Sequence, residues 1–586
     1  MQVVSLLRLA LLLRSVHGTN IIPTVASAGN GVTYHGLERN GVEAFLGIPF
    51  GQDTGGENRF RPPRPFQPEP GNVIDAQSPG AACPQETGKV RGPLALGNVT
   101  NILEDCLNLN IVRPKGCSST SRLPVLIWIY GGSFWVGTND EPTTAPDGLV
   151  LESLENGLPV IHVAINYRLG VFGFTQSKSL EEEKSENAGL RDQRLAIEWV
   201  RDNIEVFGGD PEKITIHGQS SGGFAVTAQI LAYGGSKPVP FQQGISESQA
   251  LATGLTTNMT RDAVKVLVDY VGCNKTSLDD AQTISCLQSL DMQTLLDASL
   301  ATYRSDLGDL WLPAIDGDFW PAAPSVLLRQ GRFANVTTMI GWAQDDMTLY
   351  TDPSIQTSQD TLASVRGTYR DISDANMDKL LALYPASDFA AEAAAKGNHH
   401  SSEFYRAARI ARDILMVCQP LHVAHTLGAV AGNDVFLYDW NQTIVGPALA
   451  AVRDLRGVGV PHTAEFAYVF GNLSAYDVNG YPFEPTAADY ALVRRGSRSW
   501  STFASTGRPS LEGHDTFVGF GKAYNGSGAG DAGANSGEPY IFVVGGPHEG
   551  LSAVDGAGSM PQVAEQRIRE RCAFLNSPEM IEQLGY

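Results

Sequence analysis

The sequence has no long apolar run beyond its first residues and no cluster of basic residues. No later segment reaches the roughly 18 consecutive apolar residues that suggest a membrane-spanning helix. The 586 residues carry a net charge of −21, with a pI near 4.9. An acidic surface repels the phosphates of nucleic acids. We therefore expect no nucleic-acid partner and no stable insertion into a membrane.

Cysteine is scarce, and no two cysteines stand in the close CxxC spacing of a zinc site, so we expect no metal. An odd number of cysteines leaves at least one thiol unpaired. Two pairs lie near each other in the sequence, and both are candidates for local disulfides in an oxidising compartment. They are Cys83 with Cys106 and Cys273 with Cys286, while Cys117, Cys418 and Cys572 stay unassigned.

The N-terminus predicts secretion. The apolar stretch from Leu6 to Leu13 is too short to span a bilayer, and Val16 and Gly18 suit cleavage after Gly18. We predict a signal peptide at 1–18 and a secreted, extracellular chain at 19–586. The alternative is a short amphipathic segment, because Arg8 interrupts the apolar run.

N-x-S/T triplets fit a glycosylated extracellular protein. The candidate acceptors are Asn98, Asn258, Asn274, Asn335, Asn441, Asn472 and Asn525. The segment 525–537 also contains a GxGxxG spacing, but no strand precedes it and no helical pattern follows. We therefore interpret it as a surface loop and not as a dinucleotide site.

Short apolar runs alternate with helical patterns along the chain. A near-continuous apolar run is typical of a strand that is buried on both faces, whereas the segment 190–207 has apolar residues at the spacing of one helix face. Strands interleaved with helices predict an α/β fold with a large, mostly parallel sheet covered by helices on both faces. The expected strands are 123–130, 160–165, 213–216, 337–342, 434–440 and 540–544, and the other expected helices are 224–231 and 563–575.

The segment 213–223, KITIHGQSSGG, carries the main chemical signal. It contains the pattern G-x-S-x-G between a strand and a helix, which is the setting of a nucleophile elbow. Such a turn exposes the serine hydroxyl, here that of Ser220, in front of the helix N-terminus. The alternative is an ordinary glycine- and serine-rich turn between a strand and a helix.

A nucleophilic serine also needs a base and an anion site. The strand at 123–130 ends in Gly131, Gly132 and Ser133, and a glycine turn there can direct backbone N–H groups toward a developing oxyanion. Ser221, the residue after the nucleophile, would supply a third N–H. The alternative for the two glycines is a plain turn.

At this point the sequence resembles the type-B carboxylesterase/lipase family of α/β-hydrolases, which includes cholinesterases and fungal lipases. The resemblance extends over nearly the whole mature chain and implies a single α/β-hydrolase domain at 19–586, in a secreted fungal member. The blocks that carry it are FLGIPFG at 45–51, EDCLNLNI at 104–111, WIYGGSFWVG at 128–137, NYRLGVFGF at 166–174, the segment 187–211 and GQSSGG at 218–223.

The resemblance implies a triad in the order serine, acid, histidine. The acid block reads GWAQDDM at 341–347, which puts Asp346 at the acid position with Asp345 as the competitor. The family normally has glutamate there. The histidine block reads GVPHTAEFAYVFG at 459–471 and matches His462.

Two further residues match supporting positions of the family. Glu465 matches a supporting glutamate, and Ser248 matches a serine that would bond the acid carboxylate. The resemblance also pairs the cysteines as their spacing does. The oxyanion block departs from the family in having Ser133 where a third glycine is usual.

The predicted function is hydrolysis of small-molecule carboxylic esters through an acyl-enzyme, without a cofactor. The loop between Cys83 and Cys106 lies over the active site in relatives. Here it has no tryptophan and a modest apolar content, which favours short or medium acyl esters. The alternatives are a triacylglycerol or sterol-ester lipase and a non-catalytic, cholinesterase-like binding protein.

Overall fold

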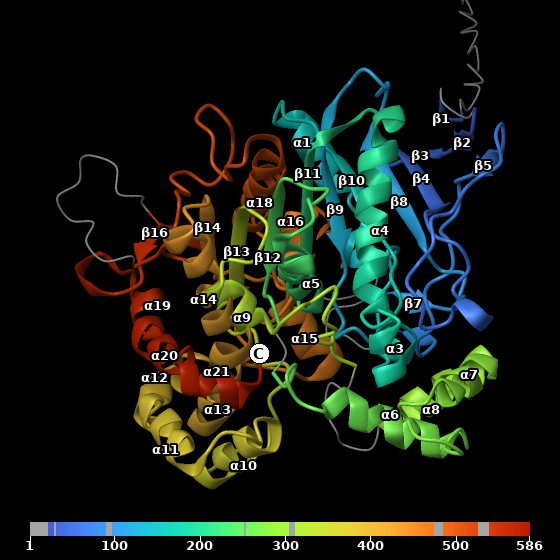
Figure 1. Ribbon diagram of the computed structural model, residues 1–586. Coiled ribbons are helices and arrows are strands. Elements are labelled where there is room, and N and C mark those ends of the chain that lie inside the picture. Colours follow the sequence, from blue (N-terminus) through green and yellow to red (C-terminus); the bar gives the residue numbers. More distant parts are fainter. Residues whose placement is uncertain are drawn as a thin grey trace, which may run out of the picture.

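An eleven-stranded sheet runs through the molecule, and helices cover both of its faces (Figure 1). The computed structural model describes residues 22–27, 31–89, 97–250, 253–303, 311–473, 485–524 and 538–586. In sheet order the strands are β16 (Gly550–Ala553), β15 (Tyr540–Val544), β14 (Val435–Trp440), β13 (Thr337–Ala343), β12 (Gln243–Glu247), β11 (Gly209–Gln219), β9 (Leu123–Ile129), β10 (Ile161–Ile165), β8 (Asn108–Pro114), β4 (Val42–Pro49) and β3 (Leu37–Arg39).

The central strands, from β10 to β15 in sheet order, are parallel, while β16 and the β8–β4–β3 edge are antiparallel. Strands that are buried on both faces need apolar side chains in both directions. All residues of β10 and β14 are buried accordingly. This arrangement confirms the predicted α/β-hydrolase fold and all six expected strands, although β11 is longer than expected.

Helices fill the two layers and one end of the sheet. α4 (Ala188–Asn203) and α5 (Ser221–Leu231) pack on one face, and α1 (Asp147–Glu155), α16 (Phe466–Val469) and α18 (Ala487–Thr506) lie on the other (Figure 1). Two helical groups extend from one end of the molecule: α6 (Met259–Tyr270), α7 (Ala281–Ser289) and α8 (Met292–Tyr303), and α10 (Ser358–Thr368), α11 (Asp374–Leu383), α12 (Ala390–Ala395) and α13 (Ser402–Arg412).

The remaining helices close the structure. They are α2 (Gly170–Phe174), α3 (Lys178–Glu182), α9 (Pro324–Arg329), α14 (Gln419–His425), α15 (Val445–Arg453), α19 (Pro561–Ala564), α20 (Ile568–Leu575) and α21 (Pro578–Leu584). The predicted single helix at 563–575 is wrong: Arg567 has a φ of 48°, which breaks the segment between α19 and α20. The other two predicted helices correspond to α4 with its 3₁₀ extension to Phe207 and to α5.

Three disulfides cross-link the described chain. Cys83–Cys106 and Cys273–Cys286 confirm the predicted pairs. The third joins Cys418 to Cys572, which are 154 residues apart, and Cys117 is left as a free thiol. Spacing along the chain offers no clue to such a distant pair.

We expect the Cys418–Cys572 bond to contribute most to stability, because it closes the longest loop. In the chain-entropy account, removing such a cross-link costs about 2–5 kcal/mol of unfolding free energy. The double variant Cys418→Ser/Cys572→Ser should therefore show a lower unfolding midpoint in denaturant. Cys117→Ser is the matched control and should leave the midpoint in place, and equal midpoints for both variants would contradict the expectation.

The signal peptide and the glycosylation sites stay predictions. Residues 1–18 and Asn525 with its loop at 525–537 lie outside the described residues. Asn441 and Asn472 are half-buried, and the remaining acceptor candidates, Asn98, Asn258, Asn274 and Asn335, are exposed. Among the described helices none has the length and apolar character to cross a bilayer.

Candidate active site

Ser220 sits at the sharp junction between β11 and α5. Its φ of 61° and ψ of −127° are rare for a residue with a side chain, and such strain persists only where surrounding structure holds it. The N–H of Ser220 donates to the carbonyl of Glu247 (2.9 Å), and its carbonyl accepts from Phe224 (2.9 Å). A Cβ at Gly222 would collide with the carbonyl of Ile129 on β9, so that only glycine fits the start of this helix.

His462 and Asp346, which are 116 residues apart in the chain, form a direct contact. Nδ1 of His462 lies 2.7 Å from Oδ1 of Asp346, and both side chains are buried. Oδ2 of Asp346 accepts a hydrogen bond from the N–H of Ala343 (2.8 Å), which fixes the carboxylate at the end of β13. Because the carboxylate accepts at Nδ1, that nitrogen carries the proton and Nε2 presents its lone pair.

Asp345, the competing acid, points elsewhere. Its carboxylate binds Nζ of Lys396 (2.6 Å) and accepts from the N–H of Val460 (2.9 Å). Burial by itself would raise the pKa of Asp345, but the charges of Lys396 and Arg409 hold it below its ordinary value. Asp345 is therefore an anchored ion-pair partner and does not contact His462.

The lone pair of His462 does not meet the serine hydroxyl in this structure. Nε2 of His462 instead lies 3.1 Å from Nε2 of Gln219, the residue before Ser220. Among the described residues no hydrogen-bond partner is found for the hydroxyl of Ser220. Sequence reasoning missed Gln219; its position next to the nucleophile was the available signal.

The turn after β9 presents backbone N–H groups beside Ser220. Within the described chain, the N–H groups of Gly132 and Ser133 have no acceptor, and Ser133 has a φ of 54°. The next N–H, that of Phe134, donates to the hydroxyl of Ser221 (3.3 Å), which ties this turn to the start of α5. Gly132 and Ser133 are thus free to bind an anion from solvent or substrate.

A cavity of about 1190 Å³ brings these groups together. Ser220, His462, Gly132 and Ser133 line it, and apolar side chains from α2, α8 and α16 and from the segments after β13 and α13 complete the wall. Most of these apolar residues are distant in sequence from the triad candidates. They include Val171, Phe172, Leu296, Leu300, Met347, Leu415, Met416 and Phe466.

The Cys83–Cys106 loop is fastened to the turn that carries Gly132. The side chain of Gln85 donates to the carbonyl of Gly137 (2.7 Å) and accepts from the N–H of the same residue (2.9 Å). Gln85 also lines the cavity. The first residues of the loop therefore form part of the cavity wall, while its part at 90–96 lies outside the described residues.

Behind the triad candidates lies a buried group of acids. Glu465 and Glu247 are buried, and both oxygens of Glu465 and Oε2 of Glu247 have no partner in the described chain. Burial raises the pKa of Glu247 to about 8, and burial with the charges of Glu247 and Asp346 raises the pKa of Glu465 well above its usual value. Burial thus favours the neutral form of both carboxyls.

The strand register explains the position of Glu247. It pairs with Gly341 on β13, which in turn pairs with Tyr438 on β14. The missing side chain of Gly341 leaves the space that the ring of Tyr438 fills. Trp500 donates to Glu247 (2.9 Å) from α18.

The predicted supporting bond from Ser248 is absent. Its hydroxyl is buried without a partner in the described structure, and the N–H of Ala343 occupies the carboxylate oxygen instead. No cluster of metal-ligating side chains exists in the part of the chain that the structure describes.

Comparison with known proteins identifies the family of the chain. The model of the family described as "Carboxylesterase family" matches residues 21–526. A secreted lipase of Arthroderma benhamiae is 49% identical over 569 residues, 96% of each chain. An inactive carboxylesterase-like protein of Byssochlamys spectabilis is 34% identical over 84% of this chain and 85% of its own. EstA of Aspergillus niger, at 23% identity, shares the fold with a TM-score of 0.75 over 97% of this chain and 100% of its own.

Proposed function

Since the chain belongs to the carboxylesterase family and is a carboxylic ester hydrolase, we propose that it works through a triad of Ser220, His462 and Asp346 and an acyl-enzyme intermediate. The contact between His462 and Asp346 beside Ser220, in one cavity, carries this proposal. We further propose that the protein is secreted, as the name of its Arthroderma relative says of that protein.

In the first step His462 accepts the proton of Ser220 at Nε2, and the serine oxygen attacks the ester carbonyl. Asp346 holds Nδ1–H in place and stabilises the imidazolium that forms. For this to happen, Nε2 must exchange its contact with Gln219 for one with Ser220. Such contacts in free enzymes are commonly longer than in the substrate complex.

The carbonyl oxygen that becomes negative is bound by the N–H groups of Gly132, Ser133 and Ser221. Donors that are fixed in advance stabilise the tetrahedral intermediate without reorganisation. The alcohol leaves with the proton from His462. Water then enters, loses a proton to His462 and releases the acid by the same path, which restores Ser220.

Labelling with a fluorophosphonate tests whether this nucleophile is active. We expect stoichiometric modification of Ser220, located by peptide mass spectrometry, together with loss of ester hydrolysis. This test also addresses the non-catalytic alternative, which the inactive Byssochlamys relative keeps relevant. Native protein that neither takes up the probe nor hydrolyses esters would favour that alternative.

The size of the cavity suggests the substrate range. Its apolar wall can bury an acyl chain, and each buried methylene contributes about 0.8 kcal/mol, or roughly a fourfold gain in kcat/KM. We expect kcat/KM for p-nitrophenyl esters to rise by about that factor per methylene from short to medium chains and then level off. A continued steep rise toward long chains would contradict this preference.

The second candidate is a lipase that acts on water-insoluble esters. The Arthroderma relative is named a lipase, and the volume of the cavity is large enough to favour this reading as well. Turnover of a triolein emulsion separates the two. A rate that jumps when the substrate forms an interface supports the lipase, and a rate that saturates with dissolved tributyrin supports the esterase.

A further inference from the structure

Two histidines lie fully buried in the sheet, outside the groups used above. His162 on β10 and His217 on β11 are both 0% exposed, and their Nε2 atoms are 3.2 Å apart. They pair with Leu126 and Trp128 on the intervening β9, two residues apart, so the alternation of a strand puts both on one face. A close contact between two imidazole nitrogens requires one proton between them.

The second nitrogen of His217 faces an acid. Its Nδ1 lies 3.5 Å from Oε1 of Glu247, and it has no hydrogen-bond partner within the described structure. Glu247 shares the same face of the sheet, because its strand neighbour Ile245 pairs with His217. A small approach of the two side chains is enough to form a hydrogen bond.

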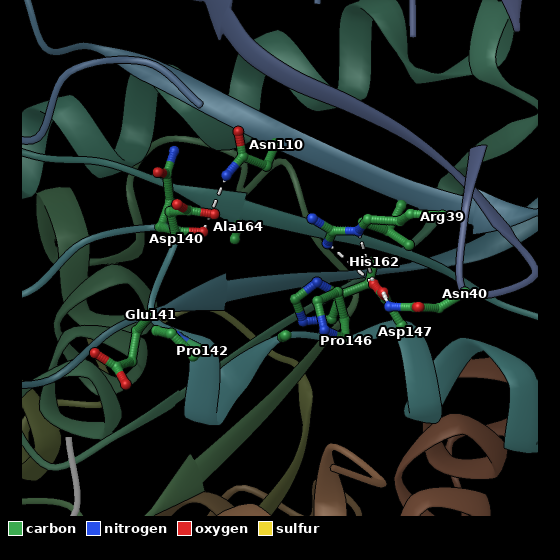
Figure 2. Close-up of a pocket in the computed structure, with 13 residues that line it drawn as sticks. Arg39, Asn40, Asn110, Asp140, Glu141, Pro142, Pro146, Asp147, His162 and Ala164 are labelled. Atoms are coloured by element: carbon green, nitrogen blue, oxygen red, sulfur yellow. Dashed lines mark hydrogen bonds and ion pairs between the residues drawn. The ribbon is translucent and has the colours of Figure 1, made fainter. Parts of the chain in front are cut away.

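Nδ1 of His162 also has no hydrogen-bond partner among the described residues, although His162 is completely buried. His162 lines a second pocket of about 270 Å³, which is large enough for several waters and shares Glu141 with the cavity of Ser220. Figure 2 shows it there beside the ion pair of Arg39 with Asp147. Oδ1 of Asn139, another residue of this pocket, is likewise buried without a partner in the described chain.

We propose that His162 and His217 form a proton relay that connects this second pocket to Glu247, across the sheet and apart from the cavity of Ser220. The proposal rests on the contacts that join His162, His217 and Glu247. It does not depend on ester hydrolysis. Water in the pocket, held by Asn139, would deliver and accept the proton at Nδ1 of His162.

Each transfer in the relay conserves protons and charge. A hydronium ion from solvent gives its proton to Nδ1 of His162 and leaves water in the pocket. The proton on Nε2 of His162 moves to Nε2 of His217, and the proton on Nδ1 of His217 moves to the carboxylate of Glu247. Both imidazoles end neutral, in the opposite tautomers. Ionisation of Glu247 runs the sequence backwards and restores them, so no other reactant is needed.

The surroundings of the two histidines favour passing a proton on and not holding it. Burial lowers the pKa of both histidines far below the ordinary value, so neither keeps a charge. At the far end, burial raises the pKa of Glu247 to about 8, and Glu465, Trp500 and Tyr438 lie around it. Glu247 is therefore the group on which an arriving proton stays.

The route has a consequence for an enzyme with substrate bound. An acyl chain in the cavity of Ser220 blocks water from that side. The second pocket is lined by residues of β8, β10 and α1 (Figure 2). The proposed relay would therefore let Glu247 exchange protons during turnover by a path that does not pass Ser220.

Infrared spectroscopy of the full mature protein after transfer to D₂O tests the relay. The C=O stretch of a protonated carboxyl shifts when its proton is replaced by deuterium, and Glu247→Gln identifies the band of Glu247. In His162→Leu we expect this shift to slow by about tenfold or more, since exchange then needs local opening of the sheet. Fluorophosphonate-labelled protein should keep the fast exchange of the unlabelled form.

Two more variants keep the test decisive. Ala164→Leu fills the second pocket without altering either histidine and should also slow the exchange, which serves if His162→Leu does not fold. His422→Leu removes a half-buried histidine on α14 and should leave the rate unchanged. A Glu247 band that is absent at neutral pH, or exchange as fast in Ala164→Leu as in the native protein, would overturn the relay.

Discussion

Replacing Ser220 with alanine is expected to lower kcat for ester hydrolysis by roughly 10⁵- to 10⁶-fold. The hydroxyl of Ser220 forms the acyl bond in the proposed mechanism, and neither His462 nor the N–H groups of Gly132 and Ser133 can substitute for it. The measurement is the rate on a soluble p-nitrophenyl ester at saturating concentration. The residual rate should reflect binding and anion stabilisation alone.

The control is Ser118→Ala, which removes a serine from an exposed loop. It should keep native kcat and native stability. Since the strained backbone at Ser220 is held by the bonds to Glu247 and Phe224, the Ser220→Ala protein should also fold with an unchanged unfolding midpoint. A folded Ser220→Ala protein with near-native kcat would rule out the proposed nucleophile.

Asp346→Asn is expected to lower kcat by about 10⁴-fold, because an amide that donates to Nδ1 leaves the wrong histidine nitrogen protonated. Asp345→Asn is the matched variant, one residue away. It should keep kcat within a small factor of native, since Asp345 binds Lys396 and not His462. The comparison therefore assigns the acid by function.

Stability should change in the opposite order. Asp345→Asn removes one of the two carboxylates that bind Nζ of Lys396, while Glu392 keeps its contact (2.7 Å), so the loss of unfolding free energy should be about 1.5–3 kcal/mol. Because the folded pKa of Asp345 is lowered, its stabilisation is present above the pKa of the unfolded chain and is lost as pH falls through the folded pKa. The difference between native and Asp345→Asn in denaturant should therefore shrink in acid. If Asp345→Asn lost most of its kcat at unchanged stability, Asp345 and not Asp346 would be the triad acid.

Local patterns in the sequence predicted much of the frame. The apolar runs marked the central strands, since strands covered on both faces have little room for polar side chains. The glycines around Ser220 marked the turn for a steric reason that the collision at Gly222 makes explicit. Matching to family blocks selected Asp346 over Asp345, and the contact with His462 agrees with that choice.

What the sequence could not predict depends on contacts between distant segments. Gln219 meets His462 across 243 residues, and the pair Cys418–Cys572 is closed by tertiary packing alone. The helix break at Arg567 was not predicted, because the apolar pattern continues across it. The buried acid Glu247 looks like an ordinary strand residue until Gly341 and Tyr438 are placed beside it.

Two hydrogen bonds between Gln85 and Gly137 fix the start of the Cys83–Cys106 loop to the turn that carries Gly132. Changes in the rest of the loop therefore need not move this turn. The segment that follows Gln85 can vary in length and composition while these two hydrogen bonds keep the N–H groups near Gly132 in place. Chimeras that take only that segment from a relative should differ in which esters they accept. The rate of the chemical step should stay the same. Evolution of substrate choice in this scaffold can therefore proceed without retuning its chemistry.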